Sequence, residues 1–303
     1  MAGTGYLWCM DEKAQLRVTF RGHAGLAVVA SQWPAPHAGT ALLLHGGGQT
    51  RHSWRRAAGL LRQYRTVVAP DARGHGESEW SLDGDYQLPT LRNDVLCVLD
   101  QIASPTVIVG SSLGGLTGLL AAERAGPATV TGLVLVDAVP HYDPAGGRRI
   151  RDFMREPPGG FATVDEAAAH LGRFRDGPDP PADRVRRNLR EGPDGRWYWH
   201  WDPAFMFRAD NDPIRYVSEL ERAAAAITVP LLLIRGAHSD VVRDDGVRRL
   251  SRVAPHARVV ELPGVAHAGP AEPNDGFAAL VAGFVEGHDR PGATGYPARP
   301  PAG

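Results

Sequence analysis

The chain has 303 residues, of which 43% are hydrophobic and 22% are charged. This length fits a large domain that carries an insertion, and the composition excludes collagen, coiled coils and disordered chains. The 33 basic and 34 acidic residues give a net charge of -1, so the sequence lacks the basic character of proteins that bind nucleic acid or anionic membranes. We expect a small-molecule substrate that is uncharged and apolar.

Short apolar runs alternate along the chain with amphipathic helical patterns, which predicts an α/β fold with a mostly parallel central sheet and helices on both faces. Several of the runs are continuously apolar, as is typical of strands buried on both faces. The expected strands are 16–20, 26–30, 41–44, 66–69, 106–109, 132–136, 231–235 and 258–262. The expected helices, with apolar residues at helical spacing, are 53–61, 91–102, 113–125, 244–253 and 274–286.

The regular alternation stops after Val136 and resumes at Val229. We interpret the residues between them as a mainly helical cap inserted into the core, with helical patterns at 163–174 and 181–190. The end of the chain is rich in Pro and Gly and has no period, which favours a disordered tail. The expected segments are a first core part at 1–138, a cap at 139–227, a second core part at 228–286 and a tail at 287–303.

Five ring-bearing residues follow one another in the expected cap, from Trp197 to Trp201. So many bulky rings in succession do not all fit a core. We therefore expect Trp197, Trp199 and Trp201 to line the substrate pocket. The alternative is that these rings only pack the cap against the core.

The cysteine content and the first residues bear on location. The two cysteines cannot build a disulfide framework. The first thirty residues carry charges and contain no apolar run followed by a cleavage site. There is no run of about 20 apolar residues. We expect a cytoplasmic protein without a membrane span.

The strongest chemical signal is an apolar strand that leads into Gly110-Ser-Ser112-Leu-Gly114 and then directly into a helix. In a G-x-S-x-G turn the serine lies on a strained connection, and the glycines remove side chains that would clash there. Ser112 is therefore the expected nucleophile. Leu113 begins the helix, so its free amide can donate to a developing oxyanion. Ser111 has the wrong register.

A serine hydroxyl needs a base to remove its proton and an acid to orient that base. Loops after two later strands supply Asp240 and His267, and the order Ser112, Asp240, His267 is the one expected of this turn. His238 is the alternative base, but it lies too near Asp240 for both to converge on the serine. Asp137 directly follows the strand 132–136 and is the alternative acid.

Together with two further motifs, these residues resemble the α/β-hydrolase fold family. One motif is the turn His45-Gly-Gly47-Gly, and the other is Asp71-Ala-Arg-Gly-His75-Gly-Glu-Ser, which is similar to the family's D-x-R-G-x-G-x-S segment. The resemblance implies that the amide of Gly47 is the second oxyanion donor beside Leu113. It also implies that His45 and His75 are structural and take no part in proton transfer.

The resemblance implies a cofactor-independent serine hydrolase, with an ester as the default substrate. Serine at the turn argues against epoxide hydrolases and haloalkane dehalogenases, which use aspartate. Cofactor-free perhydrolases, often labelled haloperoxidases, and C–C bond hydrolases share the triad and are alternatives, although the H-G-x-G-P-G form of C–C hydrolases is missing. A binding protein of this fold without turnover is the alternative of another class. Metal-binding and dinucleotide-binding motifs are absent from the sequence, so we expect no metal and no cofactor.

Overall fold

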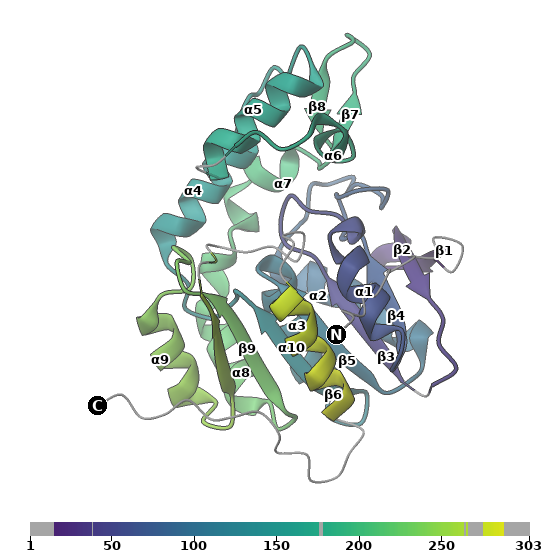
Figure 1. Ribbon diagram of the computed structural model, residues 1–303, viewed down its shortest axis with the longest axis vertical. Helices are drawn as coiled ribbons and strands as arrows, with labels where there is room; N and C mark the ends of the chain where they lie inside the picture. Colours follow the sequence, from purple (N-terminus) through teal and green to yellow (C-terminus); the bar gives the residue numbers. More distant parts are fainter. Residues whose placement is uncertain (1–14, 38, 176–177, 264, 266–274, 288–303) are drawn as a thin grey trace, which may run out of the picture.

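The computed structural model describes residues 15–37, 39–175, 178–263, 265 and 275–287. Figure 1 shows a twisted sheet flanked by helices, with a second group of helices and a small hairpin above one edge of the sheet. The described sheet has eight strands in the order β1-β2-β4-β3-β5-β6-β9-β10. The strands are β1 (Leu16–Arg21), β2 (Ala27–Trp33), β3 (Thr40–Leu44), β4 (Thr66–Pro70), β5 (Thr106–Ser111), β6 (Val130–Val136), β9 (Leu231–Gly236) and β10 (Arg258–Leu262).

The pairing of the strands explains why the polar loops meet at one edge. β1 pairs with β2, and β2 with β4, in antiparallel register, and all pairs from β4 to β10 are parallel. Parallel strands end on the same side of a sheet, so the loops that follow β3, β5, β6 and β9 lie together. These are the loops that carry the predicted site.

Apolar residues of the central strands alternate between two cores. In β3, Leu42 and Leu44 belong to one buried cluster, while Ala41 and Leu43 belong to the other. The first cluster is covered by α2 (Leu88–Ile102), α3 (Leu113–Ala125), α8 (Val217–Ala226) and α9 (Asp244–Val253). The second is covered by α1 (Arg55–Leu61) and α10 (Asp275–Gly287), which lie in front of the sheet in Figure 1. The predicted α/β fold class is confirmed.

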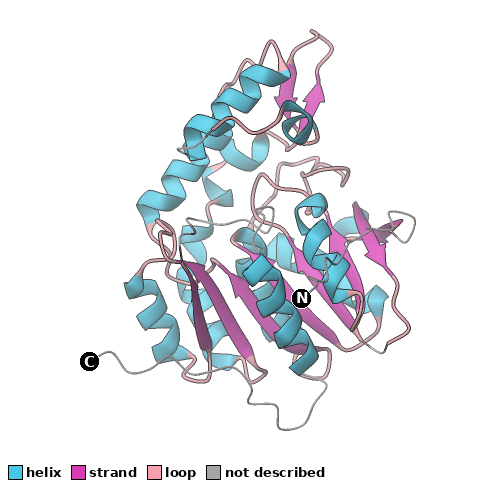
Figure 2. Cartoon of the chain, in the orientation of Figure 1, coloured by secondary structure: helices cyan, strands magenta, loops and turns pink. Residues whose placement is uncertain are grey.

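Between β6 and β9 the chain leaves the sheet and forms the layer at the top of Figure 2, which we name the inserted layer (residues 144–207). It contains α4 (Pro144–Arg155), α5 (Val164–Arg175), α6 (Ala182–Arg186), the hairpin of β7 (Leu189–Glu191) and β8 (Trp197–Trp199), and α7 (Ala204–Phe207). Two 3-10 helices, Ala209–Asn211 and Pro213–Tyr216, lead from it into α8. Although α8 falls in the range expected for the cap, its buried Leu220, Ala223 and Ala224 belong to the first core cluster of the sheet.

Two features of the inserted layer differ from the sequence-based expectation. The helix predicted at 181–190 ends at Arg186, because residues 189–191 pair instead with the aromatic strand 197–199. Helix α4 was not predicted, because its two glycines lower helix propensity. The signals for α4 were Pro144 in its first turn and Asp143, whose carboxylate accepts hydrogen bonds from the amides of residues 145 and 146.

No helix in the described part of the chain has both the length and the apolar composition needed to cross a bilayer.

Candidate active site

Ser112 lies on a strained turn between β5 and α3. Its φ of 47° and ψ of -116° are outside the regions that L-residues with side chains ordinarily adopt. A Cβ atom at Gly110 would clash with the backbone of Gly114, and one at Gly114 would clash with the carbonyl oxygens of Leu44 and His45. The glycines of the motif are therefore required by close backbone approach, and the turn presents Ser112 above the sheet.

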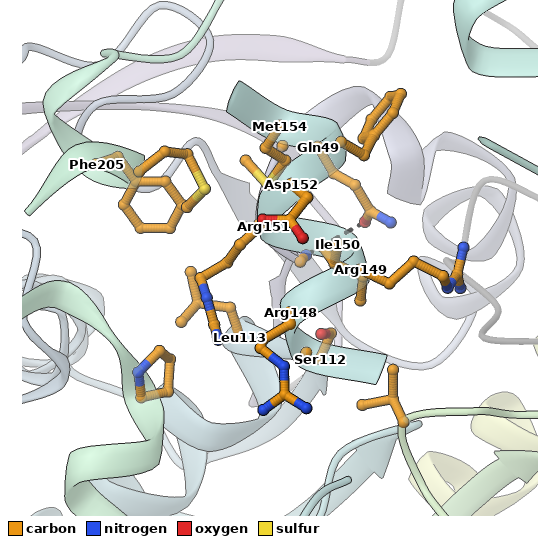
Figure 3. A pocket seen from close by; sticks show the side chains of 18 of the residues that line it. Gln49, Ser112, Leu113, Arg148, Arg149, Ile150, Arg151, Asp152, Met154 and Phe205 are labelled. Carbon is orange, nitrogen blue, oxygen red and sulfur yellow. Dashed lines mark hydrogen bonds between the residues drawn. The ribbon is translucent and has the colours of Figure 1, made fainter. Parts of the chain in front are cut away.

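Ser112 lines a cavity of about 710 Å³ between the sheet edge and the inserted layer (Figure 3). The floor comes from the loops after β3, β5, β6 and β9. Helix α4 and the segment from α7 to Pro213 supply much of the remaining wall. A cavity of this size accommodates a small to medium organic molecule.

Two backbone amides beside Ser112 are available to a ligand. Leu113 is the first residue of α3, and Gly47 lies on the turn after β3. Both residues line the cavity, and neither amide donates a hydrogen bond to a residue within the described ranges. The glycine turn approaches the serine closely, because a Cβ atom at Gly46 would lie 3.4 Å from the Cβ of Ser112. The turn is braced by Gln49, whose Oε1 accepts a hydrogen bond from the Gly46 amide at 3.2 Å.

Both candidate acids line this cavity. Asp240 follows β9, and its Oδ2 accepts a hydrogen bond from the Nε of Arg149 of α4 at 2.7 Å. Asp137 follows β6 and is only 1% exposed. Its carboxylate accepts hydrogen bonds from Ser239 Oγ at 2.8 Å and from the Gly236 amide at 3.3 Å. Asp240 therefore contacts the inserted layer, whereas Asp137 braces the loop that carries Asp240.

The predicted base, His267, lies outside the described residues, and its role stays a prediction. The competing His238 is described. It is exposed and lines the cavity, and its backbone amide donates to the carbonyl oxygen of Val265 at 2.9 Å.

A family model described as "Alpha/beta hydrolase family" matches residues 41–280. The chain belongs to the α/β-hydrolase family. It is 32% identical over 251 residues to an esterase of Mycobacterium tuberculosis, with 78% of each chain covered. It is 33% identical over 227 residues to a 3-hydroxybutyrate-oligomer hydrolase of Cupriavidus necator, covering 70% of this chain and 76% of that protein.

Solved structures of other α/β-hydrolases and esterases have the same fold. A crystal structure of an esterase of Mycobacterium tuberculosis superimposes with a TM-score of 0.68 at 28% identity, covering 89% of this chain and 92% of that one. An α/β-hydrolase from Novosphingobium aromaticivorans has a TM-score of 0.75 at 24% identity, covering 91% and 99%. The predicted resemblance is confirmed, and the chain is an enzyme of the hydrolase class.

In this α/β-hydrolase, His45 and His75 are buried, with ring centroids 5.3 Å apart. The Nε2 of His45 accepts a hydrogen bond from the amide of Ala72 at 2.9 Å, and the Nε2 of His75 accepts one from the amide of Gly48 at 3.1 Å. Each Nδ1 faces a backbone carbonyl oxygen, so each ring is neutral with its proton on Nδ1. Burial lowers the pKa of both side chains, and that of His75 falls well below its ordinary value. The two rings hold the His45–Gly48 turn against the Asp71–Ser78 turn.

A third buried histidine, His200 of the inserted layer, was not singled out in the sequence. Its ring lies 5.8 Å from that of His75. Its Nδ1 accepts a hydrogen bond from the Gly76 amide at 2.8 Å, and its Nε2 faces the carbonyl oxygen of Gly48 at 3.4 Å. Burial lowers the pKa of His200 to about 4. A neutral histidine thus connects the inserted layer to both turns, a link that no local motif indicates.

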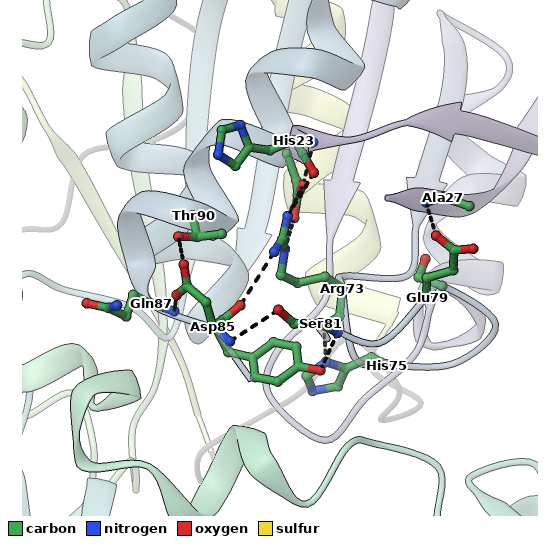
Figure 4. A network of polar contacts seen from close by, with 12 residues as sticks. His23, Ala27, Arg73, His75, Glu79, Ser81, Asp85, Gln87 and Thr90 are labelled. Carbon is green, nitrogen blue, oxygen red and sulfur yellow. Dashed lines mark hydrogen bonds and ion pairs between the residues drawn. The ribbon is translucent and has the colours of Figure 1, made fainter. Parts of the chain in front are cut away.

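The Asp71–Ser78 turn is itself fixed by charged contacts (Figure 4). The guanidinium of Arg73 donates to both carboxylate oxygens of Asp94, at 2.5 and 2.8 Å, and its Nη2 donates to the carbonyl oxygen of His23 at 3.3 Å. Arg51 pairs with Asp71, and both side chains are buried. Because burial of an unpaired charge is costly, these pairs hold the turn in one conformation.

The three tryptophans expected in the pocket separate in the structure. Trp199 and Trp201 line the cavity and stack with their ring centroids 5.0 Å apart. Trp197 is not among the residues lining this cavity, and its ring lies under the guanidinium of Arg186 at 4.7 Å. Trp197 therefore lies outside the described wall of this cavity, and its role in substrate binding stays a prediction. Two residues along a strand correspond to about 7 Å, and this distance places Trp197 further toward the hairpin tip.

Within the described ranges, no group of three or more His, Cys, Asp or Glu side chains is arranged to hold a metal ion.

Proposed function

We propose that this α/β-hydrolase is a serine esterase that acts by acyl transfer, with Ser112 as nucleophile, His267 as base and Asp240 as the acid that orients the base. The observation that carries the proposal is the strained position of Ser112, which lines a cavity of about 710 Å³ together with the Gly47 and Leu113 amides. Strain at a non-glycine residue persists where the surrounding structure enforces it, and such sites are concentrated in active sites.

In the proposed reaction, Ser112 Oγ attacks the ester carbonyl carbon while His267 takes the hydroxyl proton. The carbonyl oxygen becomes an oxyanion that accepts hydrogen bonds from the amides of Gly47 and Leu113. When the C–O bond breaks, His267 returns the proton to the leaving alcohol. A water molecule then attacks the acyl-serine, His267 takes its proton, and the acid is released with Ser112 restored.

The wall opposite the polar loops supports an ester with an apolar portion. Trp199, Trp201, Phe205 and Met154 are buried and line the cavity. The names of the two relatives, an esterase and a hydrolase of 3-hydroxybutyrate oligomers, support hydrolysis of a carboxylic ester.

The test compares hydrolysis of p-nitrophenyl butyrate by the wild type, Ser112→Ala and Ser111→Ala. We expect Ser112→Ala to lose at least 1,000-fold in kcat/KM. Ser111→Ala is the matched control, because its buried Oγ makes no hydrogen bond in the described structure, and it should keep most of the activity. Retention of activity by a folded Ser112→Ala variant would disprove the proposal. A wild type that neither turns over esters nor reacts with a fluorophosphonate probe would favour a binding protein.

A further inference from the structure

Helix α4 brings an unusual number of guanidinium groups to the cavity. Arg148, Arg149, Arg151 and Arg155 all line it, and Arg208 joins them from the segment after α7. Four aspartates, Asp137, Asp152, Asp212 and Asp240, line the same cavity, so five arginines against four aspartates give its described lining a formal charge of +1. The chain as a whole has a net charge of -1. The expectation of an uncharged substrate rested on that overall balance, which does not report the charge inside one cavity.

Four of these five arginines have a protein acceptor. Arg149 pairs with Asp240 at 2.7 Å, and Arg151 pairs with Asp212 at 3.1 Å. The Nη2 of Arg155 donates to the carbonyl oxygen of Met206 at 2.9 Å. Arg208 donates to the carbonyl oxygen of Asp83.

Arg148 differs from its neighbours. Among the described residues, no carboxylate, carbonyl oxygen or other acceptor contacts its guanidinium. Figure 3 shows its side chain together with Ser112 among the groups that line the cavity. Among the described arginines that line the cavity with Ser112, Arg148 is therefore the one whose hydrogen-bond donors are not used by the protein.

We propose that Arg148 binds a carboxylate of the substrate, so that this enzyme cleaves esters bearing a free carboxylate elsewhere in the molecule. This inference rests on the proposed esterase function and specifies its substrate class. A guanidinium presents two parallel N–H donors that match the two oxygens of a carboxylate. A single unpaired cation balances one negative charge, which favours a carboxylate over a doubly charged phosphate.

The rest of the cavity fits a substrate that has a carboxylate at one end and an apolar portion at the other. Phe205, Met154 and Trp201 provide an apolar wall for one portion of the molecule. Arg148 is exposed on α4, so water and salt screen its charge and limit its contribution. We therefore expect a preference of about tenfold for the carboxylate, which corresponds to ~1.4 kcal/mol.

The experiment uses ethyl esters of succinic, glutaric and adipic acids that end either in a free carboxylate or in the primary amide of the same length. We expect the wild type to hydrolyse one of the carboxylate esters with about tenfold higher kcat/KM than its amide counterpart, through a lower KM. Arg148→Gln should lose this preference, so that its kcat/KM values for the carboxylate ester and the amide ester of the same length become equal. Arg148→Lys should keep part of the preference, because it retains the charge. Added salt should weaken the preference in the wild type.

The matched control is Arg173→Gln on α5, an exposed arginine that does not line the cavity, which should behave as wild type. The proposal is overturned if the wild type shows no preference at any length, or if the preference survives in Arg148→Gln. Calorimetric titration of Ser112→Ala with the carboxylate esters tests binding without turnover, and the added Arg148→Gln change should weaken it about tenfold. Hydrolysis of both ester types by Ser112→Ala would contradict the proposed function, whereas the comparison of wild type with Arg148→Gln on the two ester types would still test Arg148.

Discussion

The loops at the sheet edge and the inserted layer contribute to one cavity in different ways. At the sheet edge, the site is made largely of backbone: the strained turn at Ser112 and the amides of Gly47 and Leu113. The inserted layer contributes side chains that reach the sheet edge from a distance, such as His200 on Gly76, 124 positions away, and Arg149 on Asp240. In the proposed reaction, the backbone part stabilises the reacting groups and the side-chain part selects the substrate.

Hydrogen bonds of the segment just before α7 connect the inserted layer to the sheet edge. The hydroxyl of Tyr86 donates to Asp202 Oδ2 at 2.5 Å, and the amide of Asp202 donates to the carbonyl oxygen of Gly74 at 2.8 Å. Together with His200, these contacts anchor the segment just before α7 to the Asp71–Ser78 turn and to the neighbouring His45–Gly48 turn. Substitutions in each region should therefore change different quantities: kcat, the stability of the fold, or KM for particular esters.

The largest expected effect is a difference in kcat between substitutions of the two carboxylates at the sheet edge, Asp240 and Asp137. Asp240→Asn should lower kcat for p-nitrophenyl butyrate by about 10,000-fold, because an amide no longer fixes the proton position of the base. The matched variant Asp137→Asn should keep most of kcat and unfold at a lower temperature, since Asp137 accepts hydrogen bonds from Ser239 and Gly236. Steady-state kinetics and thermal unfolding measure the two effects. The reverse order of kcat values would assign the acid role to Asp137.

The next effect probes the backbone of the sheet edge. Gly114→Ala should destabilise the protein by more than about 3 kcal/mol and abolish activity, because its Cβ has no space beside the backbone of Leu44 and His45. Gly159→Ala is the control, because nothing lies within 4 Å of the added Cβ, and its stability should be unchanged. Urea unfolding compares the two variants. Equal stability of both would show that the turn tolerates a side chain and that the glycine is not required.

Acid should weaken the connection between the two regions. The folded-state pKa of His200 is about 4, below its ordinary value of 6.5, so the unfolded chain binds more protons between these values. The stabilising effect is complete above pH 6.5 and is lost as the pH falls toward 4, by up to about 3 kcal/mol for this residue. His45 and His75 act in the same direction. Urea unfolding at a series of pH values measures the slope.

Replacement of His200 sharpens this prediction. His200→Gln keeps an acceptor and a donor but does not titrate, so the loss of stability between pH 6.5 and 4 should be smaller. His256→Gln, at an exposed position, should leave the pH dependence as in wild type. An unchanged pH profile in His200→Gln would show that another group causes the acid sensitivity.

The smallest expected effect concerns selectivity in the inserted layer. Trp199→Ala removes a ring that lines the cavity and should raise KM for long-chain p-nitrophenyl esters by about tenfold, through loss of buried apolar contact. Trp197→Ala is the matched change outside the cavity and should leave KM unchanged. KM values over a chain-length series distinguish the two. If both variants behave alike, Trp199 is only a packing residue.

Local sequence patterns predicted most strands and helices of the fold and the turn at Ser112, but not the residues of the inserted layer that line the cavity. All eight expected strands are present within about three residues, because central strands that are buried on both faces require short continuous apolar runs. The turn at Ser112 was predictable, because its glycines are required within a span of five residues. Helix α4 was missed because packing over the cavity overrides its weak propensity.

The sequence by itself determined the α/β fold class and the glycine turn that carries Ser112, because apolar runs and the contacts of neighbouring glycines are local properties. Only the tertiary structure decided which side chains face the cavity. It placed Trp199 in the wall and Trp197 outside, joined His200 to the turn at Gly48, and left Arg148 without a partner among the described residues. These outcomes depend on contacts between segments that are far apart in the sequence. The distance between such segments is set by the folded structure and cannot be read from their separation along the chain.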